Sequence, residues 1–143
     1  MRKITLVIVV AVLAYSFIQD QGISLPWTSS PTATDSLLED AYANGQSDVQ
    51  VQGSGTVVGI LSDDLDGSRH QRFILKLDSG QTVLISHNMD LAPRIDSLQK
   101  GDAVEFYGEY EWNSKGGVIH WTHHDPNGRH VAGWLKHRGK TYQ

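Results

Sequence analysis

Apolar and polar side chains alternate along most of residues 49–124, and this two-residue period constrains the fold more than any other feature of the chain. The clearest case is residues 103–112 (AVEFYGEYEW), where the apolar side chains occupy one phase of the alternation and three glutamates the other. Successive side chains of a strand point to opposite faces of a sheet, so this period is typical of strands with one buried face. The pattern predicts a mainly β domain.

Five segments show this pattern and define the expected strands. They are residues 55–61, 72–78, 82–86, 103–112 and 118–124. Ser79-Gly80 predicts a tight turn between the second and third strands, and we expect one helical turn at residues 94–99 before the fourth. Three strands, a short helical connection and two further strands are the element order of a five-stranded OB-like barrel. We expect Phe106 and Trp121 to lie together in its core.

A short helix is expected ahead of the barrel, at residues 35–44. Ser36 and Glu39 have the spacing of a capping box, and Asn44-Gly45 ends the helical pattern. The stretch before it is rich in proline, serine and threonine, which is typical of a tether. The predicted organisation is a signal peptide or signal anchor at 1–18, a polar linker with a short helix at 19–48, and an OB-like β-domain at 49–143.

Residues 1–18 have the order of an export signal. Arg2 and Lys3 precede an apolar run, residues 4–18, that is interrupted only by Thr5 and Ser16. The run is short for a membrane span and contains no good cleavage site, so a cleaved signal peptide and a retained transmembrane anchor both stay open. Either form predicts a bacterial envelope protein, on the periplasmic side of the inner membrane or secreted. An uncleaved segment would make the membrane a partner.

The densest group of potential metal ligands is the segment 120–130 (HWTHHDPNGRH). The chain has no cysteine, so histidine and carboxylate are the strong metal ligands that it can offer. The Pro-Asn-Gly sequence at 126–128 predicts a turn that brings His130 back beside His124 and Asp125, a triad suited to a divalent transition metal. His120 is a further candidate ligand, although on a strand it lies about 13 Å from His124.

Two other interpretations of these histidines stay open. They could cap the turn and pack against tryptophans with no ion present, or one of them could act as an acid or base. Thr122 and Ser114 are near in sequence, but no group is positioned to activate either as a nucleophile. The sequence therefore leans towards a protein that is not an enzyme. His87 ends an apolar strand, and we expect it to be a hydrogen-bonded core residue.

The C-terminal end of the chain is basic, because residues 115–143 carry five lysines and arginines against one aspartate. Arg129, Lys136 and Arg138 are interleaved with Trp121 and Trp134, a combination that single-stranded nucleic acid binders use and that suits acidic glycans equally. A solvated charged face above core tryptophans would have the same composition. The leading hypothesis is a non-catalytic binding module for an anionic ligand, and the alternative is a metal-dependent hydrolase acting on phosphodiesters.

Two long segments also resemble a known family. HQRFILKLDSGQTVLISHNMDLAPRI and GDAVEFYGEYEWNSKGGVIHWTHHDPNGRHVAGWLKHRGKTYQ are similar to a set of small exported proteobacterial proteins classed as a domain of unknown function, DUF 3465. The resemblance covers about residues 50–143, and IHWTHHDPNGRH is its most distinctive part. It implies an OB-like fold and an envelope or secreted location, and it carries no assigned activity.

Overall fold

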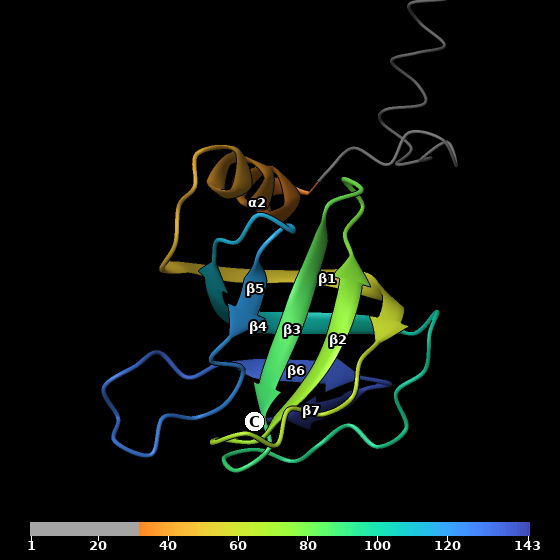
Figure 1. Ribbon diagram of the computed structural model, residues 1–143, viewed down its shortest axis with the longest axis vertical. Coiled ribbons are helices and arrows are strands. Elements are labelled where there is room, and N and C mark those ends of the chain that lie inside the picture. Colours follow the sequence, from red (N-terminus) through yellow and green to blue (C-terminus); the bar gives the residue numbers. More distant parts are fainter. Residues whose placement is uncertain (1–31) are drawn as a thin grey trace, which may run out of the picture. The chain divides into compact units, whose positions relative to one another are not determined.

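The computed structural model describes residues 32–143 of the chain. The predicted export segment at 1–18 and the linker residues up to 31 lie outside the described residues. Residues 32–143 contain the helix α2 (Ala33–Ala43) followed by seven strands (Figure 1). In this part of the chain no helix has the length and apolar character needed to cross a membrane.

The strands form one sheet that closes into a barrel. In chain order they are β1 (Val49–Ile60), β2 (His70–Lys76), β3 (Thr82–Asn88), β4 (Ala103–Glu111), β5 (Val118–His120), β6 (Trp134–His137) and β7 (Lys140–Tyr142). Neighbours pair in the order β1-β2-β3-β5-β4, and β4 pairs back with β1, which closes a ring of five (Figure 1). Only the β3–β5 pairing in this ring is parallel. The ring confirms the predicted five-stranded OB-like barrel, and β6 and β7 extend the sheet from β4.

The first strand is long enough to pair with two partners. Its first half pairs with β4 and its last part with β2. A Cβ atom at Gly55 would lie 2.9 Å from the carbonyl oxygen of Lys76, and the register with β2 shifts between Val57 and Gly59. The bulge therefore lets β1 bend so that it can pair with both partners, and the glycine leaves room for the backbone of β2 to approach it closely.

Helix α2 packs on the barrel through the side chains of Leu38 and Ala41, which are fully buried in the common core. The predicted capping box at Ser36 and Glu39 is wrong, because the helix begins earlier. Thr32 is its N-cap, and the Thr32 hydroxyl accepts a hydrogen bond from the backbone N–H of Asp35 at 3.1 Å. The helix ends at Ala43 with Asn44 as C-cap, as the Asn-Gly signal predicted.

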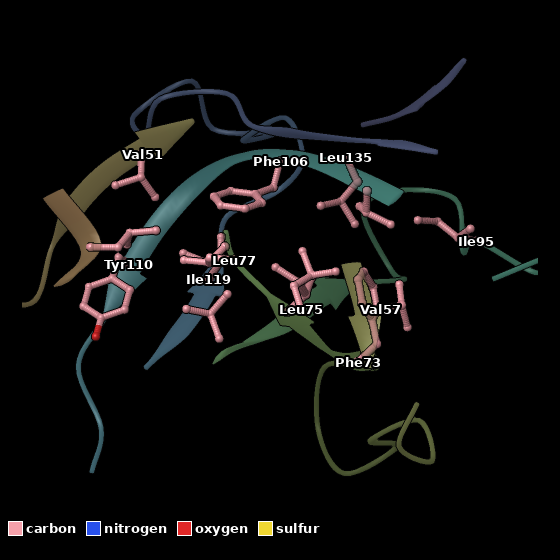
Figure 2. Packing of buried hydrophobic residues seen from close by; sticks show 14 of the residues in the cluster. Val51, Val57, Phe73, Leu75, Leu77, Ile95, Phe106, Tyr110, Ile119 and Leu135 are labelled. Carbon is pink, nitrogen blue, oxygen red and sulfur yellow. The ribbon is translucent and has the colours of Figure 1, made fainter. Parts of the chain in front are cut away.

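The core lies inside the barrel and is formed by the apolar phase of the alternating strands. Figure 2 shows Phe106 of β4 beside Leu135, with Leu75, Phe73 and Ile119 facing them from other strands. Leu135 is the cross-strand partner of Phe106, and both side chains are fully buried. Phe106 is therefore a core residue, as predicted.

The predicted fifth strand, residues 118–124, is wrong in its second half. β5 ends at His120, and Trp121 has a left-handed backbone conformation (φ 55°), which an extended strand does not continue. Pairing with β4 resumes only at Trp134 in β6. Residues 121–133, the histidine loop, therefore leave the barrel opposite Gly108 (Figure 1, the blue loop beyond β5).

The bend at Trp121 also removes this side chain from the core. Trp121 is half-buried, and its ring stacks on the ring of His130 with centroids 4.0 Å apart and planes 7° from parallel. The predicted neighbour of Phe106 in the core is thus replaced by Leu135. His123, two residues further on, is buried.

The helical turn predicted at residues 94–99 is also wrong, because this segment forms turns without a helix. Ile95 is fully buried, and its backbone is bonded on both sides to the side chain of Gln71. The Ile95 N–H donates to Gln71 Oε1 at 2.9 Å, and Gln71 Nε2 donates to the Ile95 carbonyl at 2.8 Å. A buried side-chain amide therefore satisfies the backbone groups that a helical turn would have paired.

Candidate functional site

The outward side chains of β4 form a polar face with those of its neighbours on both sides. Residues directly opposite one another in antiparallel strands point to the same face, so the register arranges this face in rows across three strands. The rows are Gln50–Glu109–His120, Gln52–Tyr107–Trp134 and Ser54–Glu105–Lys136. Their central residues are two glutamates and a tyrosine of β4.

Two residues of the first row and the next outward residue of β4 form a group of potential metal ligands, which we call the β4 cluster: Glu109, His120 and Glu111. Glu109 and Glu111 are two residues apart on β4 and therefore share a face, and His120 lies opposite Glu109 on β5. One ligand atom from each of the three residues lies within 4.8 Å of the others. The Nε2 atom of His120 is 3.5 Å from Oε1 of Glu111.

Two buried nitrogen atoms of this row have no hydrogen-bond partner among residues 32–143. They are Nε2 of His120 and Nε2 of Gln50. The His120 side chain as a whole is 36% exposed, but its Nε2 atom is shielded from solvent. An unpaired buried polar atom costs free energy, so a further group that paired with these two nitrogen atoms would be favoured here.

A second histidine reaches the cluster from the histidine loop. The ring of His130 donates through Nδ1 to the carbonyl oxygen of Val131 at 2.9 Å and through Nε2 to the carboxylate of Glu109. Burial of the ring lowers the pKa of His130, but the hydrogen bonds to Val131 and Glu109 outweigh it and hold this pKa above the ordinary value for histidine. The contact with Glu109 therefore favours the protonated form of His130.

Asp125 is used by the loop itself. Its carboxylate accepts hydrogen bonds from the backbone N–H groups of Asn127 and Arg129 at 2.9 Å and of His130 at 2.8 Å. These bonds, led by the one from Asn127, lower the pKa of Asp125. The carboxylate thus organises the turn that was predicted here, while the side chain of His124 is exposed to solvent.

The structure consequently divides the predicted metal ligands His120, His124, Asp125 and His130. It brings the rings of His120 and His130 to the β4 cluster, whereas the carboxylate of Asp125 is hydrogen-bonded to the loop backbone and the side chain of His124 is exposed. Glu109 and Glu111 were not predicted as partners of these histidines. Both glutamates were assigned to the outward face of their strand, so aligning that face with the outward face of the next strand would have found them.

The predicted anion-binding residues are also divided. Nζ of Lys136 lies 4.5 Å from the ring centroid of Trp134, so these two residues are together. Arg138 is instead 3.5 Å from the carboxylate of Asp102, and Arg129 is exposed on the histidine loop. Trp121 stacks on His130. Residues 62–71 and 113–117 do not contribute to the rows of the polar face of β4, since these rows come from β1, β4, β5 and β6.

A family model described as a protein of unknown function (DUF3465) matches residues 22–143. The matched range includes all seven strands, the β4 cluster and the histidine loop. No curated protein matches the chain.

Proposed function

The chain belongs to the DUF3465 family, and from the geometry of its barrel we propose that it binds a divalent transition-metal ion on the outer face of β4. The observation that carries this proposal is the β4 cluster, in which two carboxylates and one imidazole offer ligand atoms within 4.8 Å of one another. The unpaired Nε2 atom of His120 supports it, because an imidazole nitrogen without a hydrogen bond is free to coordinate a metal.

The donor set indicates the kind of metal. Imidazole suits zinc, copper, iron and nickel, and carboxylates additionally suit manganese. Metal–ligand bonds of about 2.1 Å place the ligand atoms within about 4 Å of one another, so a small rotation of the Glu111 and His120 side chains would close the site. Glu109 would exchange its hydrogen bond from His130 for the metal. Because that bond helps to raise the pKa of His130, losing it would lower this pKa.

The charges on this face also favour a cation. The outward residues of β4 include three glutamates, Glu105, Glu109 and Glu111, which give the face a negative potential. Two cations of the basic C-terminal segment lie next to carboxylates: Lys136 is opposite Glu105, and Arg138 is 3.5 Å from the carboxylate of Asp102. A continuous cationic track for a long polyanion is therefore less well supported than a metal site.

Metal binding is tested by titrating tag-free protein with Zn²⁺, Mn²⁺ and Ni²⁺ in a calorimeter. We expect one ion per chain, and an affinity reduced about tenfold or more in His120→Ala, the size of loss seen when groups that support a metal site are removed. His124→Ala is the matched control, because it removes an exposed histidine of the neighbouring loop. Absence of stoichiometric binding, or an equal loss in both variants, would show that the β4 cluster is not a metal site.

Hydrolysis of phosphodiesters is a second candidate function, supported by the exposure of the cluster. The Glu111 and His120 side chains are 34% and 36% exposed, whereas that of Glu109 is 12% exposed, so water and substrate would reach an ion with three protein ligands from the side of Glu111. Bis(p-nitrophenyl) phosphate with Zn²⁺ or Mn²⁺ is a direct assay, and turnover should disappear in His120→Ala. Metal binding without turnover would leave a non-catalytic binding module.

The location of the protein is part of the same proposal. The basic flank and apolar run of residues 1–18 support delivery of the barrel to the cell envelope, on the periplasmic side of the inner membrane or outside the cell. If the segment is retained, the membrane is its partner.

A further inference from the structure

A groove of about 540 Å³ lies on the same polar face as the β4 cluster, and the proposed metal site does not use it. It is lined by Thr34, Gln52, Gly53, Ser54, Glu105, Trp134 and Lys136. The lining therefore comes from the start of α2, from β1, from β4 and from β6. The second and third cross-strand rows supply most of it.

The groove combines one aromatic ring with neutral and charged polar side chains. The indole of Trp134 lies 6.0 Å from the ring of Tyr107 and next to the Lys136 ammonium. Around it are hydroxyl, amide, carboxylate and ammonium groups, so both donors and acceptors are available. A polyhydroxylated ring needs such a set, because its C–H face packs on an aromatic ring while its hydroxyls form hydrogen bonds in several directions.

The charges of the groove restrict the class of ligand that it can bind. Lys136 is its cation, and Glu105 stands directly opposite on the neighbouring strand. A DNA backbone would be repelled by Glu105 as well as attracted by Lys136, and its deoxyribose rings offer no free hydroxyl from which Glu105 could accept a hydrogen bond. A sugar with one carboxylate and several hydroxyls matches both groups, because Lys136 can pair with the carboxylate and Glu105 can accept from a hydroxyl.

The wall of the groove is already formed by packing within the protein. The hydroxyl of Thr34 donates to the carbonyl oxygen of Gln52 at 2.5 Å, which ties the start of α2 to β1. A Cβ atom at Gly53 would lie 2.9 Å from both Thr34 Cγ2 and Phe106 Cζ, so glycine is needed for this close approach. A wall held in this way loses little freedom when a ligand binds.

We propose that this groove binds a carboxylate-bearing sugar residue of an acidic glycan, with Trp134 as the stacking surface and Lys136 as the carboxylate partner. The groove and the β4 cluster are separate sites. Glu105 and Glu109 are four residues apart on one strand, about 13 Å, with Tyr107 between them. A longer glycan would extend over Tyr107 towards the cluster, but binding in the groove does not require a metal.

The test is a calorimetric titration of the protein with tri-galacturonic acid at low salt, beside neutral maltotriose and an oligo-dT of eight nucleotides. We expect tri-galacturonic acid to bind, and Lys136→Gln to weaken it roughly tenfold, the size of a lost charge-assisted hydrogen bond. Maltotriose should bind more weakly and be insensitive to Lys136→Gln. Trp134→Leu should weaken both sugars.

Lys140→Gln is the matched control. Lys140 lies on β7 with Nζ 4.8 Å from the ring centroid of Tyr142, so it forms the same kind of cation–aromatic pair outside the groove. This variant and His120→Ala should bind tri-galacturonic acid as the wild type does, which separates this inference from the metal proposal. An equal loss in Lys140→Gln, no binding of either sugar, or binding of oligo-dT alone with loss in Lys136→Gln would overturn the proposal.

Discussion

The neutral core histidine His87 should make the protein progressively less stable as the pH falls below neutrality. His87 on β3 is fully buried. Its Nε2 donates to the carbonyl oxygen of Pro93 at 2.9 Å, so its Nδ1 accepts from the hydroxyl of Thr122 at 2.7 Å. Burial lowers the pKa of His87 to about 4; the Pro93 carbonyl partly opposes this, and the neighbouring His123 and His70 add to it.

The size and sign of the effect follow from this pKa. In the unfolded chain histidine titrates near 6.5, so between pH 6.5 and about 4 the unfolded chain binds more protons than the folded protein. The free energy of unfolding therefore has its full value above pH 6.5 and falls as the pH is lowered towards 4. A difference of 2.5 pKa units corresponds to about 3 kcal/mol in total. About 2.5 kcal/mol of this should be lost by pH 4.5.

Urea unfolding of the wild type and of His87→Gln at pH 7.5 and pH 4.5 measures this directly. The variant has no titrating group at this position, so the wild type should lose about 2.5 kcal/mol more than the variant between the two pH values. His130 works in the opposite direction, because its raised pKa gives stability that is present at low pH and lost as the pH rises. That contribution is common to both proteins and cancels. The same pH dependence in both would refute a buried neutral His87.

Three further predictions concern the core, a close approach and export. Phe106→Ala should lower the free energy of unfolding by about 3–5 kcal/mol in urea titrations, and a loss below about 1 kcal/mol would place Phe106 outside the core. Gly117→Ala should lower the melting temperature clearly more than its control Gly80→Ala. Both backbones have positive φ, but a Cβ at Gly117 would lie 2.1 Å from the ring of Tyr110, whereas Gly80 has open space around it. Equal melting temperatures would contradict this. A periplasm-active reporter fused after Gln143 should be active, and activity of only a cytoplasm-active reporter would exclude export.

Local patterns were enough to predict most of the barrel. The alternation of apolar side chains identified the hairpin of β2 and β3, the whole of β4 and the start of β5, because each has one face in the core. The short strand β6 was missed, although Leu135 and His137 alternate with exposed residues, because its lysine and tryptophan were interpreted as a binding surface. Trp121 was misplaced because its left-handed backbone depends on the loop that follows it.

The candidate site was less predictable, because it depends on which residues face one another across strands. The alternation put Glu109 and Glu111 on the polar face of their strand and His120 on the next strand, but only the β4–β5 register brings the three together. The histidines of the loop were predicted as metal ligands because they are dense in the sequence. Of the two in the predicted triad, His130 folds back to β4, and His124 stays in solvent. Sequence proximity was therefore a poor guide to shared chemistry here.

Because the histidine loop interrupts the predicted fifth strand, it can be replaced without changing the pairing of the strands on either side. The two ends of the loop are joined by the hydrogen bond from the N–H of Gly133 to the carbonyl oxygen of His123 at 2.9 Å. The strand before the loop, β5, and the strand after it, β6, both pair with β4, and only Gly108 of β4 lies between the two pairings. Barrel closure therefore places no demand on the length of residues 124–132, and the entropy of closing a loop grows only slowly with length. Loops of different length and chemistry can be grafted between these two ends, so the same barrel can present new side chains to the polar face of β4 without changing the register of its strands.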